Sequence, residues 1–230
     1  APLTHREGMA ATTLCWVTVA VFGGLPFHFS GVLPHTADFV FEAVSGFTTT
    51  GASVITDVEV VPKGILFWRS LTHWMGGMGI IVLGLAILPF LGVGGMQLYK
   101  AEVPGPTPDK LKPRLKDTAM ILWKVYVGFS IVETILLMVG GMDLFDALCH
   151  TFGTMATGGF STKNASIGYY NSVYIDIVVT IFMLIGGMNF SLHFELFRGN
   201  PKAMWRDGEW RFFMITVFVF TLLIITDLMM

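Results

Sequence analysis

Two polar segments of this otherwise apolar chain have the composition of a site that holds a dehydrated cation. Residues 41–53 read FEAVSGFTTTGAS and residues 148–161 read LCHTFGTMATGGFS, so each segment places hydroxyl groups next to glycine and keeps carboxylates out of the turn itself. Backbone carbonyl oxygens can replace the hydration shell of a potassium ion, and glycine permits the backbone path that aims successive carbonyls at one axis. The predicted ligands are the backbone carbonyls of Thr48, Thr49, Thr50 and Gly51, and of Met155, Ala156, Thr157 and Gly158.

The two segments look like copies of one another. They align without a gap when Gly51 is placed on Gly158, an alignment that also pairs Thr50 with Thr157. A second match follows each segment, because residues 75–79 read MGGMG and residues 185–189 read IGGMN. Small residues at such places let helices approach closely. Together the matches predict a tandem duplication in which both copies have the same topology.

The elements that would position these segments are membrane-spanning helices. The hydrophobic fraction is 53%, charged residues make up 13%, and the mean hydropathy is +0.68, whereas a soluble domain carries about 25% charged residues. A net charge of -2 provides no basic field for nucleic acid. Five apolar runs reach the roughly 20 residues that a bilayer requires, at residues 9–29, 64–91, 118–141, 171–197 and 210–230.

Each polar segment lies between two of these runs and includes an amphipathic stretch too short to span, at residues 35–47 and 142–154. A polar loop at that depth cannot face lipid, but it can line a water-filled path, so the pattern predicts an ion pore. We therefore expect an all-α membrane protein with two complete helix–pore-loop–helix repeats and the first helix of a third. The expected parts are a first repeat at 1–99, a cytoplasmic connector at 100–117, a second repeat at 118–199, a second connector at 200–209, and the opening helix of a third repeat at 210–230.

The orientation follows from the basic residues. Lysine and arginine gather between residues 100 and 116 and between residues 198 and 211, which predicts that both connectors face the cytoplasm. The short helices then enter from outside with their C-terminal ends pointing inward. The negative end of a helix dipole at that place suits a cation.

The same residues resemble a known family. Residues 41–52 and 156–161 resemble the first two pore loops of the TrkH/KtrB family of potassium transporters, and residues 68–79, WRSLTHWMGGMG, are similar to the helix that follows its first loop. The resemblance implies four helix–loop–helix repeats around one pore and the pore-forming subunit of a potassium uptake system. It further implies a multi-pass protein among the lipids of a bacterial or archaeal inner membrane, dimerisation, and a cytoplasmic nucleotide-binding regulator of the TrkA/KtrA type. It implies K⁺ as the transported ion, no cofactor and no enzymatic activity; a cation transporter of the same fold that also carries Na⁺ is the alternative.

Two loops can furnish only about half of a four-sided filter. We expect the other sides to come from sequence beyond these residues or from another copy of the chain. The chain is accordingly expected to be a segment of a longer protein.

Charged and histidine residues inside the apolar runs leave further interpretations open. Arg69 needs a partner within the membrane, and both Glu42 and Asp38 are within reach, so Arg69 is expected to brace the short helix against the spanning helix or to act as a gate. The alternative from a different class is a membrane-embedded enzyme that uses His73, His150 and His193, but these histidines form no paired ligand motif. A secondary transporter with inverted repeats is disfavoured because both copies point the same way.

Overall fold

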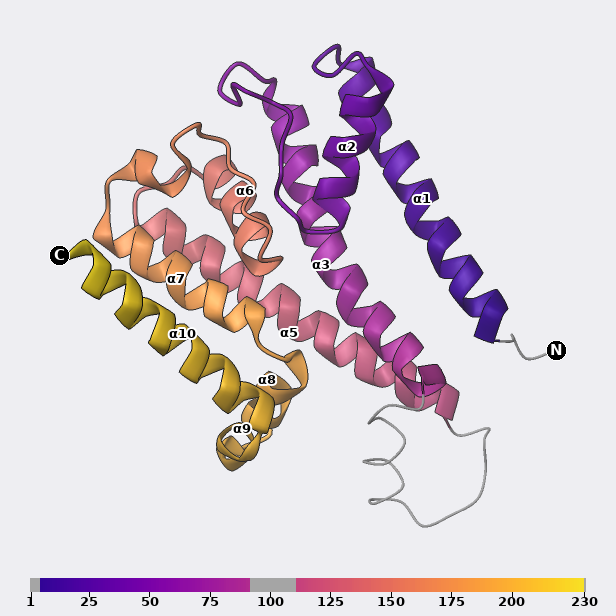
Figure 1. Cartoon of the computed structure of the whole chain (residues 1–230), viewed down its shortest axis with the longest axis vertical. Coiled ribbons are helices and arrows are strands. Elements are labelled where there is room, and N and C mark those ends of the chain that lie inside the picture. The colour runs from indigo at the N-terminus through magenta and orange to yellow at the C-terminus, as the bar shows by residue number, and fades with distance from the viewer. Residues whose placement is uncertain (1–4, 92–110, 230) are drawn as a thin grey trace. The chain divides into compact units, whose positions relative to one another are not determined.

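The computed structural model describes residues 5–91 and 111–229, and within that part every regular element is a helix (Figure 1). The expected all-α class is therefore confirmed for the described residues. Of the connector expected at 100–117, residues 100–110 lie outside the described part, whereas residues 111–117 already belong to a helix.

The described residues form two compact units, and the division falls between Gly186 and Gly187. The first unit contains α1 (His5–Phe29), α2 (Thr36–Phe47), α3 (Lys63–Leu91), α5 (Leu111–Val139), α6 (Leu144–Met155), the 3₁₀ helix η2 (Ser166–Tyr170) and α7 (Val173–Gly187, whose last residue falls at the division). The second unit contains α8 (Phe190–Phe197), α9 (Pro201–Arg206) and α10 (Gly208–Leu228).

Local sequence explains where several helices begin and end. Gly31 and Gly141 follow α1 and α5 with φ of 75° and 100°, the left-handed conformation that commonly ends a helix. The Asp143 side chain caps α6 by accepting a hydrogen bond from the Asp146 amide at 2.7 Å. The chain can therefore reverse direction twice and send α2 and α6 back along their neighbours.

The fourth predicted run, residues 171–197, is not one helix. Helix α7 ends at Gly187 and α8 begins at Phe190. Between them Asn189 has extended backbone angles, and its side chain accepts a hydrogen bond from the Ser191 amide at 3.0 Å. The asparagine thus starts a new helix, because its side chain satisfies an amide that lacks a partner in the first turn.

The core of the first unit holds the two short helices in place. Helix α2 contacts α1 and α3, and α6 contacts α3 and α5. Phe27 of α1 packs with Phe39 and Ala43 of α2 in a buried cluster, and Trp68 of α3 packs against that cluster. The Trp68 indole also donates a 2.8 Å hydrogen bond to the carbonyl oxygen of Gly23, which ties α3 to α1.

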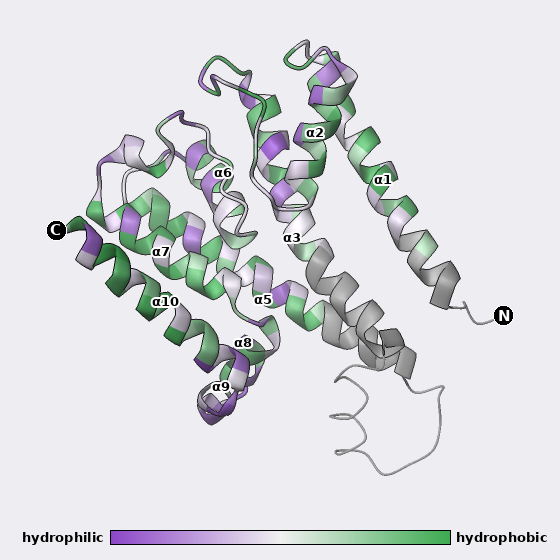
Figure 2. Ribbon diagram, in the orientation of Figure 1, coloured by the Kyte–Doolittle hydropathy of each residue, from purple (hydrophilic) through white to green (hydrophobic). Residues whose placement is uncertain are grey.

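Within the described residues, two helical segments are long and apolar enough to cross a membrane, Met120–Val139 of α5 and Gly208–Leu228. Helices α7 and α8 meet the same test when counted together as one broken span. Apolar residues cover most of α10 (Figure 2), and none of its side chains is buried. An apolar helix without a buried face requires lipid or further protein around it.

Candidate functional site

The two short helices end in the same backbone conformation. After α2 and α6, Thr48 and Ala156 keep right-handed helical angles, and the next residues, Thr49 and Thr157, have φ of 57° and 54°. A β-branched residue rarely adopts a positive φ, and the strain costs on the order of 1–3 kcal/mol. In each loop the strained residue is a threonine, and it stands two positions after the last residue of the helix. This agreement indicates that the surrounding contacts impose the same backbone conformation on both loops.

The register of the two loops differs from the gapless alignment. Thr49 matches Thr157 in backbone angles, and Gly51, with φ of 78°, matches Gly159, with φ of 86°. The alignment of Gly51 with Gly158 is therefore wrong by one residue. The residue types match best when Gly51 is paired with Gly158. The backbone angles of the two turns match only when Gly51 is paired with Gly159.

Arg69 of α3 contacts α2, which leads into the first loop, and the segment that follows the second loop. Its Nε lies 2.6 Å from Oε1 of Glu42 on α2, and its side chain is 4% exposed while that of Glu42 is fully buried. Its Nη1 donates a 3.1 Å hydrogen bond to the carbonyl oxygen of Ser161, which follows the second loop. The guanidinium also lies 3.6 Å from the ring centre of Phe160. One buried cation is thus held by groups from both polar segments, residues 41–53 and 148–161.

Glu42 in turn fixes the segment that leaves the first loop. Its Oε1 accepts a 2.8 Å hydrogen bond from the Ser53 hydroxyl, and its Oε2 accepts a 3.0 Å bond from the Val54 amide. A buried carboxylate requires such partners, because an unpaired charge in a low-dielectric interior is very costly. Arg69 and Glu42 thus form an ion pair, as expected from the sequence. Glu42 also binds Ser53 and Val54, in the segment that leaves the first loop.

The second loop has a different support at the matching place. The His150 side chain lies in α6, where Nδ1 donates to the Asp146 carbonyl oxygen at 2.7 Å and Nε2 lies 3.0 Å from the Ser161 hydroxyl. Since the carbonyl can only accept, this pattern assigns the proton to Nδ1 and leaves Nε2 to accept from Ser161. A neutral histidine–serine pair therefore stands where the first loop has Glu42 and Ser53.

A polar cluster at the start of α6 holds the chain beyond the second loop. The Asp146 carboxylate accepts hydrogen bonds of 2.7 Å from both Thr162 and Tyr170, and it lies 3.3 Å from Nζ of Lys163. Burial by itself would raise the pKa of Asp146, but the hydrogen bonds from Tyr170 and Thr162 and the charge of Lys163 outweigh it and hold that pKa below its usual value. Asp146 is therefore charged at neutral pH.

Asn164 joins the segments that follow the two loops. Its Oδ1 accepts a 2.9 Å hydrogen bond from the Val58 amide, its Nδ2 donates a 2.8 Å bond to Asp57, and its amide donates a 3.1 Å bond to Glu59. The hydrogen bond from Asn164 is the main reason why the pKa of the Asp57 carboxyl lies below its usual value. Asn164 thus links the segments after the two loops, in addition to the link through Arg69.

Glycines allow the loops and helices to touch. A Cβ on Gly51 would overlap the carbonyl oxygen of Gly158, so the two loops meet backbone to backbone. In α3 a Cβ on Gly76 would overlap the carbonyl oxygen of Phe47, and in α7 a Cβ on Gly186 would lie 3.0 Å from that of Met155. The close approach predicted for the Gly-Gly-Met tripeptides is therefore present at both.

His73 fills the space between Arg69 and the second loop. Its ring stacks on Phe160 with 3.8 Å between centres, and a Cβ on Gly158 would overlap it. Neither ring nitrogen has a hydrogen-bond partner among the described residues. Within the same part of the chain no group of three or more His, Cys, Asp or Glu could hold a metal ion. His73 thus packs against the loop backbone.

Comparisons with known proteins identify the family of the chain. Residues 1–230 match the family described as TrkH, cation transport protein. The chain belongs to the TrkH family. It is 48% identical over 231 residues to the Trk system potassium uptake protein TrkH of Escherichia coli (strain K12), covering 99% of this chain and 47% of that protein. It is 46% identical over 228 residues to the protein of the same name from Halomonas elongata, covering 98% of this chain and 47% of that one.

A solved TrkH-family structure has the same fold. The crystal structure of the potassium transporter TrkH from Vibrio parahaemolyticus matches with a TM-score of 0.83 and 40% identity, covering 96% of this chain and 45% of that chain. The chain therefore spans about half the length of the relatives it matches. The family model that matches describes a cation transport protein and not an enzyme.

The sequence anticipated only part of this TrkH-family site. Glu42 and Arg69 were expected to meet, and they do. The importance of Ser161, His150 and Asn164 was missed. The identical serines Ser53 and Ser161 would have indicated the correct register, because they lie at the same distance along the chain from Gly51 and Gly159.

Proposed function

We propose that these residues form half of the ion-conducting pore of a potassium uptake protein, with the two loops as two sides of a carbonyl-lined filter. The observation that carries the proposal is the pair of loops with matching strained backbones, which meet at Gly51 and Gly158 and share one buried arginine. The relatives named as potassium uptake proteins support K⁺ as the ion.

The ligands in this proposal are backbone carbonyls. The first side uses Thr48, Thr49, Thr50 and Gly51, and the second uses Met155, Ala156, Thr157 and Gly158, to which the structural register adds Gly159. The Thr48 hydroxyl donates to the Val44 carbonyl at 2.7 Å and lies 2.7 Å from the Thr50 hydroxyl. These hydroxyls therefore brace the turn, which leaves backbone oxygens as the groups available to replace water around an ion.

The surroundings of the loops suit a cation. Helices α2 and α6 both end at the loops, so both present the negative ends of their dipoles there. A cavity of about 350 Å³ adjoins the second loop and is lined by Thr157, Gly158 and Gly159 together with Val179 and Met183 of α7. The second loop thus borders an open space beside the backbone groups that would bind the ion.

We further propose the organisation expected from the sequence, namely tandem repeats at 1–99 and 118–199, connectors at 100–117 and 200–209, and the first helix of a third repeat at 210–230. The whole protein would be a multi-pass protein of a bacterial or archaeal inner membrane. It would form a homodimer and bind a cytoplasmic nucleotide-binding regulator. The relatives are named as proteins of a "Trk system". That name supports a membrane subunit that works with other components.

The test replaces Gly51 with serine in the full-length protein reconstituted into liposomes. Gly51→Ser adds a side chain against the Gly158 carbonyl at a positive φ, so potassium flux and its selectivity over sodium should both fall. Gly31→Ser is the matched control, because Gly31 also has a positive φ, 75°, but no atom lies near its Cβ position. This control should keep both flux and selectivity.

Unchanged selectivity in Gly51→Ser, in protein that remains folded, would remove this glycine from the filter. Equal potassium and sodium flux through the unaltered protein would instead support a transporter of the same fold that also carries Na⁺.

A further inference from the structure

The second unit contains an apolar groove between α8 and α10. The groove has a volume of about 260 Å³ and follows the first two turns of α10, from Glu209 to Thr216. Its walls include Leu192 of α8 and Trp210 and Phe213 of α10. Most of the residues that line it are apolar, so the groove can accept a hydrocarbon chain.

The stretch that leads from α8 into α10 is basic. Its four basic residues are all exposed, and none of them forms an ion pair within the part of the chain that the structure describes; they are Arg198, Lys202, Arg206 and Arg211. The two acidic residues between positions 198 and 211 are Asp207 and Glu209, so this stretch has a net charge of +2, whereas the whole chain has a net charge of -2. The carboxylate of Asp207 is engaged in capping α10, where it accepts a 2.7 Å hydrogen bond from the Trp210 amide.

Arg211 is folded back onto the end of α9. Its Nε donates a 3.3 Å hydrogen bond to the Asp207 carbonyl oxygen, and its Nη2 donates a 3.3 Å bond to the Arg206 carbonyl oxygen. These bonds use two of the five N–H groups of the guanidinium. The other three remain beside the backbone of Arg206, and a guanidinium suits the oxygens of a phosphate group.

Two tryptophans lie where the basic stretch meets the apolar helix. Trp205 of α9 and Trp210 of α10 have ring centres 4.8 Å apart, and Trp205 is 69% exposed. Figure 2 shows hydrophilic residues on α9 and apolar residues along most of α10. Tryptophan is enriched at the level of the lipid headgroups. Because Trp210 also lines the groove, the groove and the basic residues meet at this boundary.

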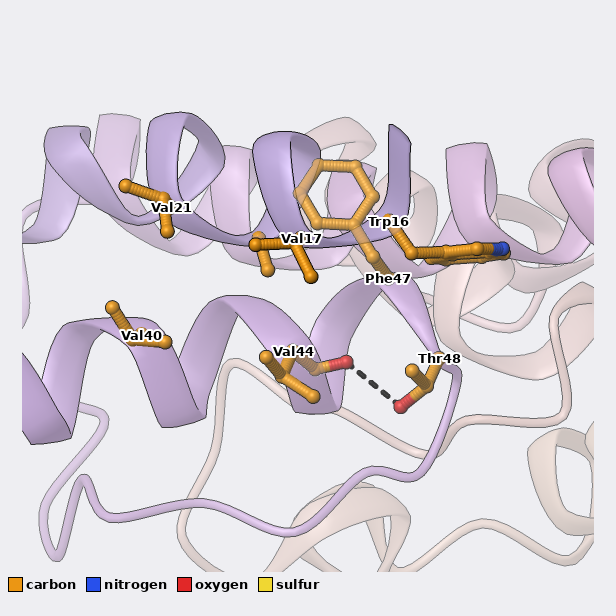
Figure 3. A pocket seen from close by; sticks show the side chains of 8 residues that line it. Trp16, Val17, Val21, Val40, Val44, Phe47 and Thr48 are labelled. Atoms are coloured by element: carbon orange, nitrogen blue, oxygen red, sulfur yellow. Dashed lines mark hydrogen bonds between the residues drawn. The ribbon is translucent and has the colours of Figure 1, made fainter. Parts of the chain in front are cut away.

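A groove in the first unit lacks the charged neighbours. It lies between α1 and α2, has a volume of about 290 Å³ and includes a tryptophan, Trp16, in its wall (Figure 3). Its lining also includes Val17 and Val44, and none of the described residues that line it is charged. The α1–α2 groove therefore serves as a comparison for lipids that differ only in the charge of the headgroup.

We propose that the α8–α10 groove binds an anionic phospholipid, with an acyl chain in the groove and the phosphate group at Arg206 and Arg211. Glu209 also lines the groove, so the phosphate must lie on the side of the two arginines, away from that carboxylate. Basic residues next to a membrane-spanning helix attract anionic lipids, and Arg198 and Lys202 add to this attraction within the screening length. The proposal rests on the membrane location in the proposed function and is independent of the filter.

The test is native mass spectrometry of the full-length protein in detergent, titrated with phosphatidylglycerol or with phosphatidylcholine of the same acyl chains. The unaltered protein should bind phosphatidylglycerol, which is anionic, more tightly than phosphatidylcholine. Arg206→Gln should lower the affinity for phosphatidylglycerol about fivefold, which corresponds to about 1 kcal/mol for one basic residue, and leave that for phosphatidylcholine unchanged. Glu209→Gln should raise the affinity for phosphatidylglycerol, because a negative charge beside the headgroup is removed. Lys63→Gln, at an exposed position at the start of α3, is the charge-matched control and should change neither affinity.

The location is tested in liposomes with a phosphatidylglycerol that carries a diazirine in one acyl chain. After illumination, mass spectrometry should find adducts on the peptides of α8 and α10 that contain Leu192 and Phe213. Excess unlabelled phosphatidylglycerol should suppress these adducts, and excess phosphatidylcholine should not. Any adducts at the α1–α2 groove, around Trp16, should respond equally to both competitors.

Equal affinity for the two lipids, or a groove without adducts because another part of the protein covers it, would overturn the proposal. Potassium flux of the same protein in liposomes separates this failure from failure of the proposed function. Equal binding of both lipids by protein that conducts potassium would refute the lipid site alone, and a preference for phosphatidylglycerol in folded protein that conducts no potassium would refute the pore alone.

Discussion

Removal of the buried charge of Arg69 tests whether the ion pair with Glu42 stabilises the structure around the two loops. The Arg69 and Glu42 side chains are 4% and 0% exposed and lie 2.6 Å apart. Breaking a buried ion pair by removing one partner costs about 3–5 kcal/mol, largely because the remaining charge is left without compensation. The structure predicts where each variant falls in that range.

Arg69→Gln should fall near the lower end, about 3 kcal/mol, because Glu42 keeps its hydrogen bonds from Ser53 and Val54. Glu42→Gln should fall near the upper end, about 5 kcal/mol, since among the described residues the guanidinium then keeps the Ser161 carbonyl and the face of Phe160. The double variant should cost less than the sum of the two, because no charge is then left buried.

The assay is a double-mutant cycle on the free energy of unfolding of the full-length protein in mixed micelles, together with potassium flux in liposomes. Flux should fall with stability in Arg69→Gln, because Arg69 joins α2 to the segment after the second loop, and Arg69→Lys should retain part of both. Arg198→Gln, at an exposed position after α8, is the control and should change stability by less than about 0.5 kcal/mol. Additivity of the two single variants to within about 0.5 kcal/mol would refute the coupling. Full stability with higher flux in Arg69→Gln would identify Arg69 as a gate.

Two further predictions concern the glycines of α3 and the polar cluster of α6. Gly76→Ala should destabilise the protein by about 1–3 kcal/mol, because its Cβ would overlap the Phe47 carbonyl, whereas Gly79→Ala on the same helix meets no atom and should be neutral or stabilising in the same unfolding assay. The lowered pKa of Asp146 stabilises the folded state above the usual Asp value of about 3.9 and loses that contribution as the pH falls below it. The stability of Asp146→Asn measured by acid titration should therefore fall less steeply below about pH 4 than that of the unaltered protein, and parallel curves would contradict this role.

The helices and the Arg69–Glu42 pair could be predicted because each follows from a local rule. Apolar runs of sufficient length indicate helices, and a charge inside such a run requires a partner nearby. Gly76 could be anticipated for a similar reason, since small residues allow close backbone approach.

The register of the loops and their cross-connections could not be predicted in the same way. Thr49 and Thr157 adopt left-handed angles that threonine normally avoids, so residue preferences point away from the true conformation. Asn164 has no distinguishing neighbours in the sequence, and its partners Asp57 and Glu59 lie more than 100 residues earlier in the chain, after the first loop. Such contacts arise from tertiary packing, which a pattern of single residues does not encode.

The unequal supports of the two loops follow from one arginine serving both. Val179 of α7 precedes Gly186 by the same number of residues as Arg69 precedes Gly76, so α7 has an apolar residue where α3 has a cation. A charged Glu42 is useful only beside that cation, and its counterpart His150 forms a neutral pair with Ser161 instead. Arg69 nevertheless reaches the second loop through the Ser161 carbonyl. Both loops therefore keep the same backbone conformation with a single buried ion pair, which limits the number of charges that must be desolvated behind the loops.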